Sequence, residues 1–195
     1  MGNEIVKEFY KNRIDLYGLT SRVVWDNVES QRLRFKILTE IGDLNGKSVL
    51  DVGCGFGDFY EFLAESHINV LKYSGIDLVE DMIKEARKRH FLPDFEVFDI
   101  LKHNVKKFDY VFGSGIFNVS FDGWIDHTYI MLKKMFYACN IGIAVNFLSW
   151  YAENLSPKCH YVHPSLILGV AFDLSSKVVF RHDYKINDFT LYIYR

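Results

Sequence analysis

The sequence predicts one α/β domain with a mostly parallel sheet, and three observations indicate this fold class. From Lys47 onward, short apolar segments alternate with segments of helical periodicity, which is the pattern of βαβ units. Gly53, Gly55 and Gly57 directly follow the first apolar segment, where a strand would turn into a helix. The 195 residues are 49% hydrophobic, which suffices for one packed core. We therefore expect a single domain over residues 1–195.

Residues 1–46 are expected to form a helical segment ahead of an α/β core at residues 47–195. Apolar side chains recur with a period of about 3.6 residues over residues 3–17, and this stripe ends at Gly18, where a glycine that ends a helix belongs. A second helical stretch covers residues 29–41 and ends in a turn rich in Gly, Asp and Asn.

The first strand of the core is expected at residues 48–52, which are largely apolar. After the glycine loop, Asp58 and Glu61 have the spacing of a capping box, so Asp58 is expected to cap a helix. A second unit follows, with a strand at 70–77 and a helix at 80–90. Because the acidic start and basic end of that helix match the helix dipole, its basic residues do not indicate nucleic-acid binding.

Two further strands are expected at residues 95–100 and 108–113. The polar loop at 102–107 joins them, so the crossover helix there is short or missing. Residues 124–139 have helical periodicity and lead into an apolar strand at 141–147. These segments complete a set of five parallel strands.

The last segments predict a helix and a hairpin. Pro164 stands at a good first-turn position and opens a helix that extends through Ala171. Residues 177–184 and 189–194 alternate like paired strands, and the turn at 185–188 joins them. We therefore expect a hairpin at the end of the sheet.

Composition and charge exclude several classes of partner. Lys and Arg total 23 against 25 Asp and Glu, so the net charge of -2 offers no basic field for nucleic acid. No apolar run approaches the roughly 18 to 20 residues that span a bilayer, and the start is too charged for a signal peptide. Cys54, Cys139 and Cys159 are an odd, widely separated set, which indicates reduced thiols. We expect a cytoplasmic protein without a nucleic-acid or membrane partner.

The glycine loop carries acids that decide between two kinds of cofactor. A dinucleotide site would need a third glycine where this chain has Asp58, and a carboxylate there would repel a pyrophosphate. Asp51, two residues before Gly53, adds a second negative charge. Both carboxylates suit a cofactor with an ammonium and a sulfonium group, as S-adenosylmethionine has.

Two more acids stand at the ends of the next expected strands. Asp77 lies about 20 residues beyond the glycine loop, where a carboxylate accepts hydrogen bonds from ribose hydroxyls, although NAD enzymes use the same device. Asp99 is placed to take an adenine amino group, with the backbone of Ile100 beside the ring. Both acids could instead cap the turns that follow them. The carboxyl edge of a parallel sheet is where open α/β folds place ligands.

Four sequence blocks, VLDVGCGFGDF, YSGIDLVEDM, FEVFDI and FDYVFGSGIF, resemble successive blocks of class I S-adenosylmethionine-dependent methyltransferases. The resemblance covers the chain from about Lys47 to its end and implies a seven-stranded, Rossmann-like sheet whose last hairpin includes one antiparallel strand. We also expect the helical segment at residues 1–46 to close over the pocket as a lid. The strings YGLTSRVVW and HDYKINDFT are similar to those of small bacterial methyltransferases of unassigned substrate.

The resemblance assigns parts of the cofactor to particular residues. It places the methionine part against Asp51, Gly53 and Gly55, the ribose against Asp77 and Leu78, the adenine against Asp99 and Ile100, and the methyl group above residues 113–115. The full set of expected cofactor-binding residues is Asp51, Gly53, Gly55, Phe56, Asp58, Asp77, Leu78, Asp99, Ile100, Gly113 and Ser114.

The chain departs from the methyltransferases that modify bases. Residues 113–117 read GSGIF, where enzymes that methylate amino groups of bases or glutamine have an Asn/Asp-Pro-Pro-Tyr block, and no Pro-Cys pair for cytosine C5 methylation occurs. We therefore expect methyl transfer to a small molecule, with S-adenosylhomocysteine as the second product. The alternatives are a non-catalytic S-adenosylmethionine-binding module and an NAD-dependent oxidoreductase.

Residues for the acceptor and for catalysis are harder to predict. His182 is the candidate general base, although adjacent strand residues point to opposite faces and Asp183 would not orient it. No metal site is expected, because Cys159, His160 and His163 lack a fourth ligand at a suitable spacing. The other candidates are polar or aromatic residues of the lid and of the loops after the fourth and fifth strands, and the aromatic ones could equally belong to the core. They are Tyr17, Trp25, Gln31, Arg34, Asn118, Asn146 and Tyr151.

Overall fold

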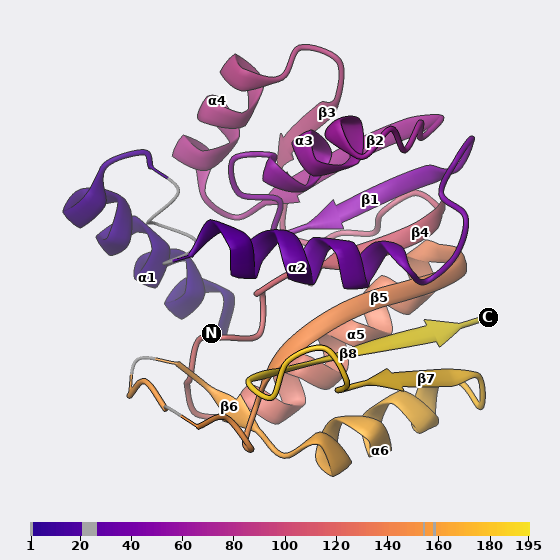
Figure 1. Cartoon of the computed structure of the whole chain (residues 1–195). Coiled ribbons are helices and arrows are strands. Elements are labelled where there is room, and N and C mark those ends of the chain that lie inside the picture. The colour runs from indigo at the N-terminus through magenta and orange to yellow at the C-terminus, as the bar shows by residue number, and fades with distance from the viewer. Residues whose placement is uncertain (1, 21–26, 154, 158) are drawn as a thin grey trace.

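The computed structural model describes residues 2–20, 27–153, 155–157 and 159–195, which form helices on both sides of one sheet (Figure 1). The strands are β1 (Ser48–Val52), β2 (Lys72–Asp77), β3 (Asp94–Val97), β4 (Phe108–Gly113), β5 (Cys139–Ser149), β6 (Tyr161–Val162), β7 (Val178–Arg181) and β8 (Asp188–Tyr194). The helices are α1 (Gly2–Tyr17), α2 (Val28–Thr39), α3 (Asp58–Glu65), α4 (Glu80–Arg89), α5 (Trp124–Ala138) and α6 (Pro164–Leu174). None of the helices in these segments is long and apolar enough to cross a membrane.

The order of the strands changes side at β1: β2 and β3 are added on one side of it, and β4 and the later strands on the other. Along the sheet the order is β3-β2-β1-β4-β5-β8-β7, and the strands from β3 to β5 run parallel to their neighbours. β8 runs antiparallel to both β5 and β7, so the expected mostly parallel sheet with a closing hairpin is confirmed. The short β6, which pairs with the end of β5, was not predicted. Because the chain builds outward from β1 in both directions, a crevice forms at the carboxyl ends of β1 and β4.

Adjacent residues of the central strands face opposite cores. On β1, Val49 packs with α2, α3 and α4, whereas Leu50 packs with α5 and α6. On β4, Phe112 and Val111 alternate in the same way, as the pleat of a strand requires. Figure 1 shows α2 and α3 in front of the sheet and α5 behind it. The centre of the sheet is thus covered on both faces, which explains why the central strands β1, β4 and β5 are mainly apolar.

The first two helices have different roles in the fold. α2 belongs to the core, because Leu38 is fully buried in the cluster on the front face. α1 lies instead near the edge toward which β1 points (Figure 1). There Tyr10 and Ile14 pack against a small cluster that contains Phe56 and Met82. Gly18, with φ of 65°, ends α1, as its sequence predicted.

The predicted capping box at the start of α3 is wrong. The residue that caps this helix is Gly57, with φ of 83° and no side-chain hydrogen bond. Asp58 is the first helical residue, and its Oδ2 accepts a hydrogen bond from Nε2 of Gln31 instead. A long-range partner on α2 therefore replaces the local one that the spacing indicated.

The third strand is shorter than the sequence predicted. β3 ends at Val97, and the amide of Phe98 then donates to the carbonyl of Asp77. Asp99 lies beyond the strand, where its Oδ1 accepts a hydrogen bond from the amide of Leu101 at 2.9 Å. This side-chain contact closes a turn and takes the chain away from the sheet.

Candidate active site

A cleft lies at the carboxyl ends of β1, β2 and β4, between the glycine loop and α1. We call it the glycine-loop cleft; its two parts meet at Gly53, Gly55 and Ser114. The larger part is lined by Asn3, Val6, Tyr10, Val52, Gly53, Gly55, Ile76, Asp77, Leu78, Val79, Met82, Phe98, Ile100, Ser114, Gly115, Ile116, His127 and Met131. The smaller part is lined by Gln31, Phe35, Asp51, Gly53, Cys54, Gly55, Phe56, Asp58, Phe59 and Ser114.

The glycine loop has a backbone that only glycine adopts easily. Gly53 and Gly55 have φ angles of 72° and 55°, in the left-handed region. A Cβ atom on Gly53 would also overlap the side chain of Ile116. The amides of Gly53 and Cys54 both donate to the carbonyl of Ile76, which ties the loop to β2. The loop therefore presents bare backbone to the cleft.

Asp77 connects the end of β2 to the glycine loop. Its Oδ2 accepts from the amide of Gly55 and its Oδ1 from the amide of Val79, both at 2.9 Å. Burial raises the pKa of the Asp77 carboxyl. Among the described residues it forms no ion pair that would compensate for this burial. Asp77 thus closes its own turn, as the alternative interpretation of the sequence proposed, and also faces the cleft with spare acceptor capacity.

Asp51 is the second carboxylate of the cleft, and unlike the partly exposed Asp77 it is buried, at 3% exposed. Burial raises its pKa to about 7; the hydrogen bond from Oη of Tyr73, at 2.6 Å, opposes this shift, while the negative charges of Asp77 and Asp58 add to it. Asp58 differs, because Gln31 and Arg89 both contact it. A buried carboxylate without a cation is costly. The cleft therefore favours a ligand that brings positive charge and hydrogen-bond donors.

A buried polar chain at the far end of the cleft joins α1 to the core. Nδ2 of Asn3 donates to Oδ1 of Asp99 at 2.6 Å, and Oδ1 of Asn3 lies 2.7 Å from Nε2 of His127. Burial lowers the pKa of His127, which favours its neutral form. Asn3 and His127 both line the cleft, and neither was predicted. The available signal was a polar Asn3 on the apolar stripe that contains Val6 and Tyr10.

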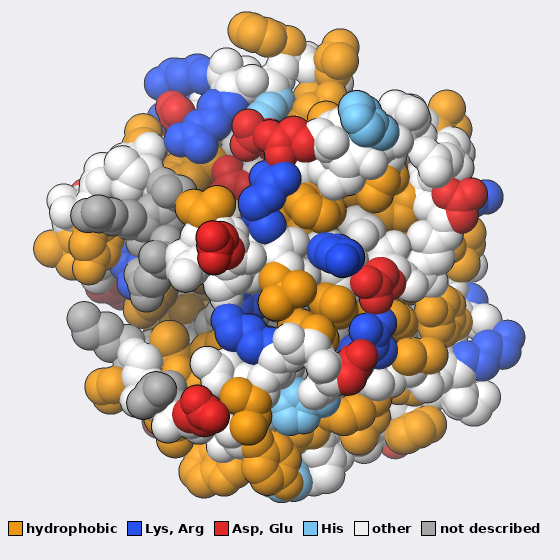
Figure 2. All heavy atoms as spheres, viewed as in Figure 1, with side chains coloured by type: hydrophobic (Ala, Val, Ile, Leu, Met, Phe, Trp, Pro, Cys, Tyr) orange, Lys and Arg blue, Asp and Glu red, His pale blue; other side chains and the backbone are white. Residues whose placement is uncertain are grey.

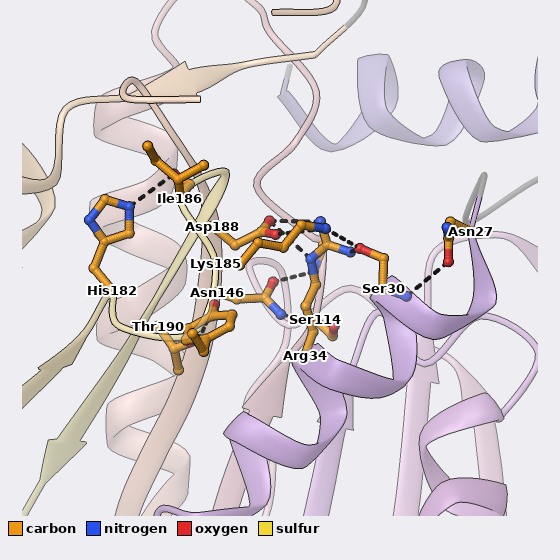
Figure 3. A network of polar contacts seen from close by, with 12 residues as sticks. Asn27, Ser30, Arg34, Ser114, Asn146, His182, Lys185, Ile186, Asp188 and Thr190 are labelled. Atoms are coloured by element: carbon orange, nitrogen blue, oxygen red, sulfur yellow. Dashed lines mark hydrogen bonds and ion pairs between the residues drawn. The ribbon is translucent and has the colours of Figure 1, made fainter. Parts of the chain in front are cut away.

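The loop after β4 forms the floor of the cleft, and hydrogen bonds to the side chain of Asn146 fix its conformation. Oδ1 of the buried Asn146 accepts from the amide of Gly115 at 2.9 Å, and its Nδ2 donates to Oγ of Ser114 at 3.1 Å (Figure 3). Ser114 lines the cleft, whereas Gly113 and Asn146 are not among its lining residues. Asn146 therefore positions the floor without forming part of its surface.

A second cavity of about 250 Å3 lies beside the first, and Tyr10 lines both. We call it the arginine cavity; it is enclosed by α1, α2, the loops that follow β4 and β5, and the β7–β8 turn. Its lining residues are Phe9, Tyr10, Arg13, Asn27, Ser30, Arg34, Asn118, Leu148, Ser156, Cys159, Tyr161 and Asn187.

A buried ion pair holds one wall of the arginine cavity (Figure 3). Nε and Nη2 of Arg34 donate to Oδ1 of Asp188 at 3.0 and 2.7 Å, and Nη1 donates to Oγ of Ser30 at 2.8 Å. The two charged side chains are 8% and 1% exposed. Lys185 contacts both Asp188 and Ser30. The sequence identified Arg34 as a candidate but gave no reason to pair it with Asp188.

The remaining sequence candidates are scattered. Asn118 lines the arginine cavity, whereas Tyr17 is exposed on α1. Oη of Tyr151 contacts Nε2 of His163 on the surface. Nε2 of His182 lies 3.0 Å from the carbonyl of Ile186, and His182 lines neither the cleft nor the cavity. Trp25 lies outside the described residues.

Comparison with known proteins places the glycine loop in a recognised domain. Residues 49–135 match the methyltransferase domain family. A phthiotriol/phenolphthiotriol dimycocerosates methyltransferase of Mycobacterium tuberculosis is 41% identical over 54 residues, which are 28% of this chain. The matched segment spans only 20% of that relative's length.

Solved structures resemble the chain over almost its whole length. Magnesium protoporphyrin IX methyltransferase from Synechocystis PCC 6803 with bound SAM superposes with a TM-score of 0.70 at 17% identity, over 99% of this chain and 96% of the other. A DhpI-SAM-HEP complex superposes with a TM-score of 0.74 at 13% identity, over 98% and 96%. At these identities the likeness concerns the fold.

Proposed function

Because the chain has the fold of class I methyltransferases and a methyltransferase domain at residues 49–135, we propose that it transfers a methyl group from S-adenosylmethionine to a small molecule. The observation that carries this proposal is the pair of carboxylates on either side of the left-handed glycine loop, the buried Asp51 and the partly buried Asp77. Their burial without an ion pair among the described residues fits a cofactor that is cationic and rich in hydroxyl donors.

The cleft offers a distinct set of groups to each part of the cofactor. Asp51, together with Gln31, would hold the ammonium end, and Asp77 would accept hydrogen bonds from ribose hydroxyls. Ile100 and Met131 line the cleft and would supply apolar walls for the adenine ring, whereas Asp99 is not among the lining residues and contacts Asn3 instead. When bound, S-adenosylmethionine supplies a methyl group that is already activated by its sulfonium.

The work left to the protein is to position the acceptor and to exclude water. α1 lies against the cleft through Asn3, Val6 and Tyr10, so this helix closes the site from one side. The assignment of residues 1–46 as a lid therefore applies best to α1, since α2 is part of the core. We do not assign a general base, because His182, the candidate from the sequence, lines neither the cleft nor the arginine cavity.

The cofactor assignment is tested by calorimetry with S-adenosylhomocysteine and with NAD. We expect the first to bind and the second not to bind. Asp77→Asn should weaken S-adenosylhomocysteine by about 10- to 100-fold, the range for loss of a hydrogen bond to a charged group. Asp173→Asn, an exposed acid on α6, is the matched control and should have no effect. Equal affinity of the Asp77→Asn variant and the wild type would show that the assignment is wrong.

Turnover separates an enzyme from a module that only binds the cofactor. The protein is incubated with S-adenosylmethionine and a panel of small metabolites, and release of S-adenosylhomocysteine is followed. We expect release with at least one acceptor and none after Asp77→Asn at low cofactor concentration. Tight cofactor binding with no release across a chemically broad panel would favour the binding module.

A further inference from the structure

Asn3, on the first turn of α1, connects the glycine-loop cleft to Asp99. Asn3 lines the cleft, whereas Asp99, the acid expected to take the adenine amino group, does not. The carboxylate of Asp99 is already engaged. Its Oδ1 accepts from Nδ2 of Asn3 at 2.6 Å and from the amide of Leu101 at 2.9 Å. Its Oδ2 lies 3.5 Å from Nζ of Lys102. A base in the cleft would therefore meet the side chain of Asn3 rather than this carboxylate.

The two neighbours of Asn3 fix the orientation of its amide. A carboxylate only accepts hydrogen bonds, so Nδ2 of Asn3 is the atom that faces Asp99. Oδ1 of Asn3 then faces Nε2 of His127 at 2.7 Å, and because a carbonyl oxygen carries no proton, the imidazole donates. Turning the amide over would bring Oδ1 against the carboxylate, which places one acceptor against another.

The start of α1 is packed closely enough to hold this amide in place. Asn3 is 7% exposed. A Cβ atom on Gly2 would lie only 2.6 Å from the ring of His127 and 2.7 Å from that of Phe121, so the helix start leaves no room even for a methyl group. Farther along the helix, Ile14 packs against a small apolar cluster. The amide of Asn3 is therefore a fixed part of the wall of the cleft.

An amide held in this way keeps one donor and one acceptor position for a ligand. The side chain of Asn has two N–H donors and two oxygen lone pairs, and Asp99 and His127 use one of each. Adenine presents an amino group beside a ring nitrogen, and an Asn amide pairs with these two groups through its carbonyl and its N–H. The remaining hydrogen-bonding capacity of Asn3 thus matches an edge of adenine.

Other features near the cleft do not distinguish one base from another. Phe98, Ile100 and Met131 line the same part of the cleft and offer apolar surfaces that suit any purine ring. On the outer surface, Figure 2 shows Lys and Arg side chains interspersed with Asp and Glu over and around α2. Neither the apolar walls nor this mixed surface charge selects a base, so selection depends on buried hydrogen-bonding groups.

From these observations we propose that Asn3 recognises the base of the cofactor: its Oδ1 accepts from the adenine amino group, and its Nδ2 donates to the neighbouring ring nitrogen. Asp99 and His127 are positioning residues that hold the amide in this orientation. A base with a carbonyl in place of the amino group would set that oxygen against Oδ1 and bind poorly. The inference rests on the proposed binding of S-adenosylmethionine and names the residue that makes this binding specific for adenine.

The experiment compares S-adenosylhomocysteine with S-inosylhomocysteine, its deaminated analogue, by calorimetry. We expect the wild type to bind the adenine compound at least about tenfold more tightly, because the analogue leaves buried polar groups unpaired. Asn3→Ala should weaken S-adenosylhomocysteine by about three- to tenfold and change the affinity for the analogue by less than about twofold. The preference for adenine should therefore fall to about threefold or less.

Two other variants of α1 separate recognition of the base from the packing of the helix. Ile14→Ala loosens the packing of α1 at a position that does not line the cleft, so it should weaken both compounds by the same factor and leave the preference for adenine unchanged. Lys11→Gln, which removes an exposed charge of α1 outside the cleft, should change neither affinity.

The failures of the two proposals are distinguishable. If S-adenosylhomocysteine binds but is not preferred over its deaminated analogue, or if Asn3→Ala keeps the full preference, the role of Asn3 is wrong and the methyltransferase proposal stands. The same holds if Ile14→Ala loses the preference as far as Asn3→Ala does. Tighter binding of S-adenosylhomocysteine by Asn3→Ala would also contradict the proposal, because Asn3 would then cover Asp99 instead of contacting the base. If S-adenosylhomocysteine itself does not bind, both proposals fall.

Discussion

The glycine-loop cleft and the arginine cavity lie side by side, and Tyr10 lines both, but the charged side chains that line them have opposite signs. The glycine-loop cleft contains the buried Asp51 and the partly buried Asp77, whereas Arg13 and Arg34 line the arginine cavity, where Arg34 is paired with Asp188. The two sites are also held in place differently. The acids of the glycine-loop cleft lie at the ends of strands, whereas the arginine cavity depends on contacts between segments that are distant in the sequence. The two sites therefore differ in the sign of their charged residues and in the way those residues are held.

We expect the largest effect, a loss of stability, from breaking the buried Arg34–Asp188 ion pair that holds one wall of the arginine cavity. Arg34→Ala removes the nearer cation of the buried Asp188 and leaves the longer contact with Lys185, which should lower the free energy of unfolding by up to about 3 to 5 kcal/mol. Urea denaturation measures this change. Arg32→Ala, which removes the exposed pair with Glu65, is the control and should cost less than about 1 kcal/mol. Similar losses in both variants would mean that the buried pair does not hold the cavity wall.

The glycine-loop cleft should respond to pH through Asp51. Its pKa of about 7 in the folded protein exceeds the unfolded value of about 3.9, so the folded state binds the extra proton between these values. Stability of the cofactor-free protein should therefore fall as pH rises from about 4 to about 7, by up to about 4 kcal/mol. Asp51→Asn should remove this dependence, as measured by thermal unfolding.

Cofactor affinity should change with pH in the opposite sense. The ammonium group of S-adenosylhomocysteine prefers ionised Asp51, so this ligand should bind up to about tenfold more tightly at pH 8 than at pH 6. Calorimetry at the two pH values measures the ratio. A ratio near one in the wild type, equal to that of Asp51→Asn, would contradict the role of this carboxylate.

These two regions also differ in how far the sequence predicts them. The glycine loop, Asp51 and Asp77 are close together in the chain and follow apolar strands, so the pattern of the sequence places them at one sheet edge. The pairs Arg34–Asp188 and Asn3–Asp99 join residues 154 and 96 positions apart. No local pattern encodes such contacts, because they depend on how α1 and α2 pack against the finished sheet.

A smaller effect is expected where α1 joins the cleft. Asn3→Ala removes the hydrogen bonds to Asp99 and His127, and it should weaken S-adenosylhomocysteine by about three- to tenfold, since buried hydrogen bonds contribute about 0.5 to 1.5 kcal/mol. Hydrogen exchange of the α1 amides should also become faster. Asn104→Ala, which removes an exposed contact to Lys134, is the control. Unchanged exchange and affinity would show that α1 is held by its apolar face alone.

The smallest effect is expected at His182. This residue lies by the β7–β8 turn, contacts the carbonyl of Ile186 and lines neither hollow, so it has no path to the reacting atoms. His182→Gln keeps a donor for that carbonyl, and kcat should change by less than about twofold, which is below about 0.5 kcal/mol in activation free energy. A loss of a hundredfold or more, with a changed pH profile, would restore His182 as the general base.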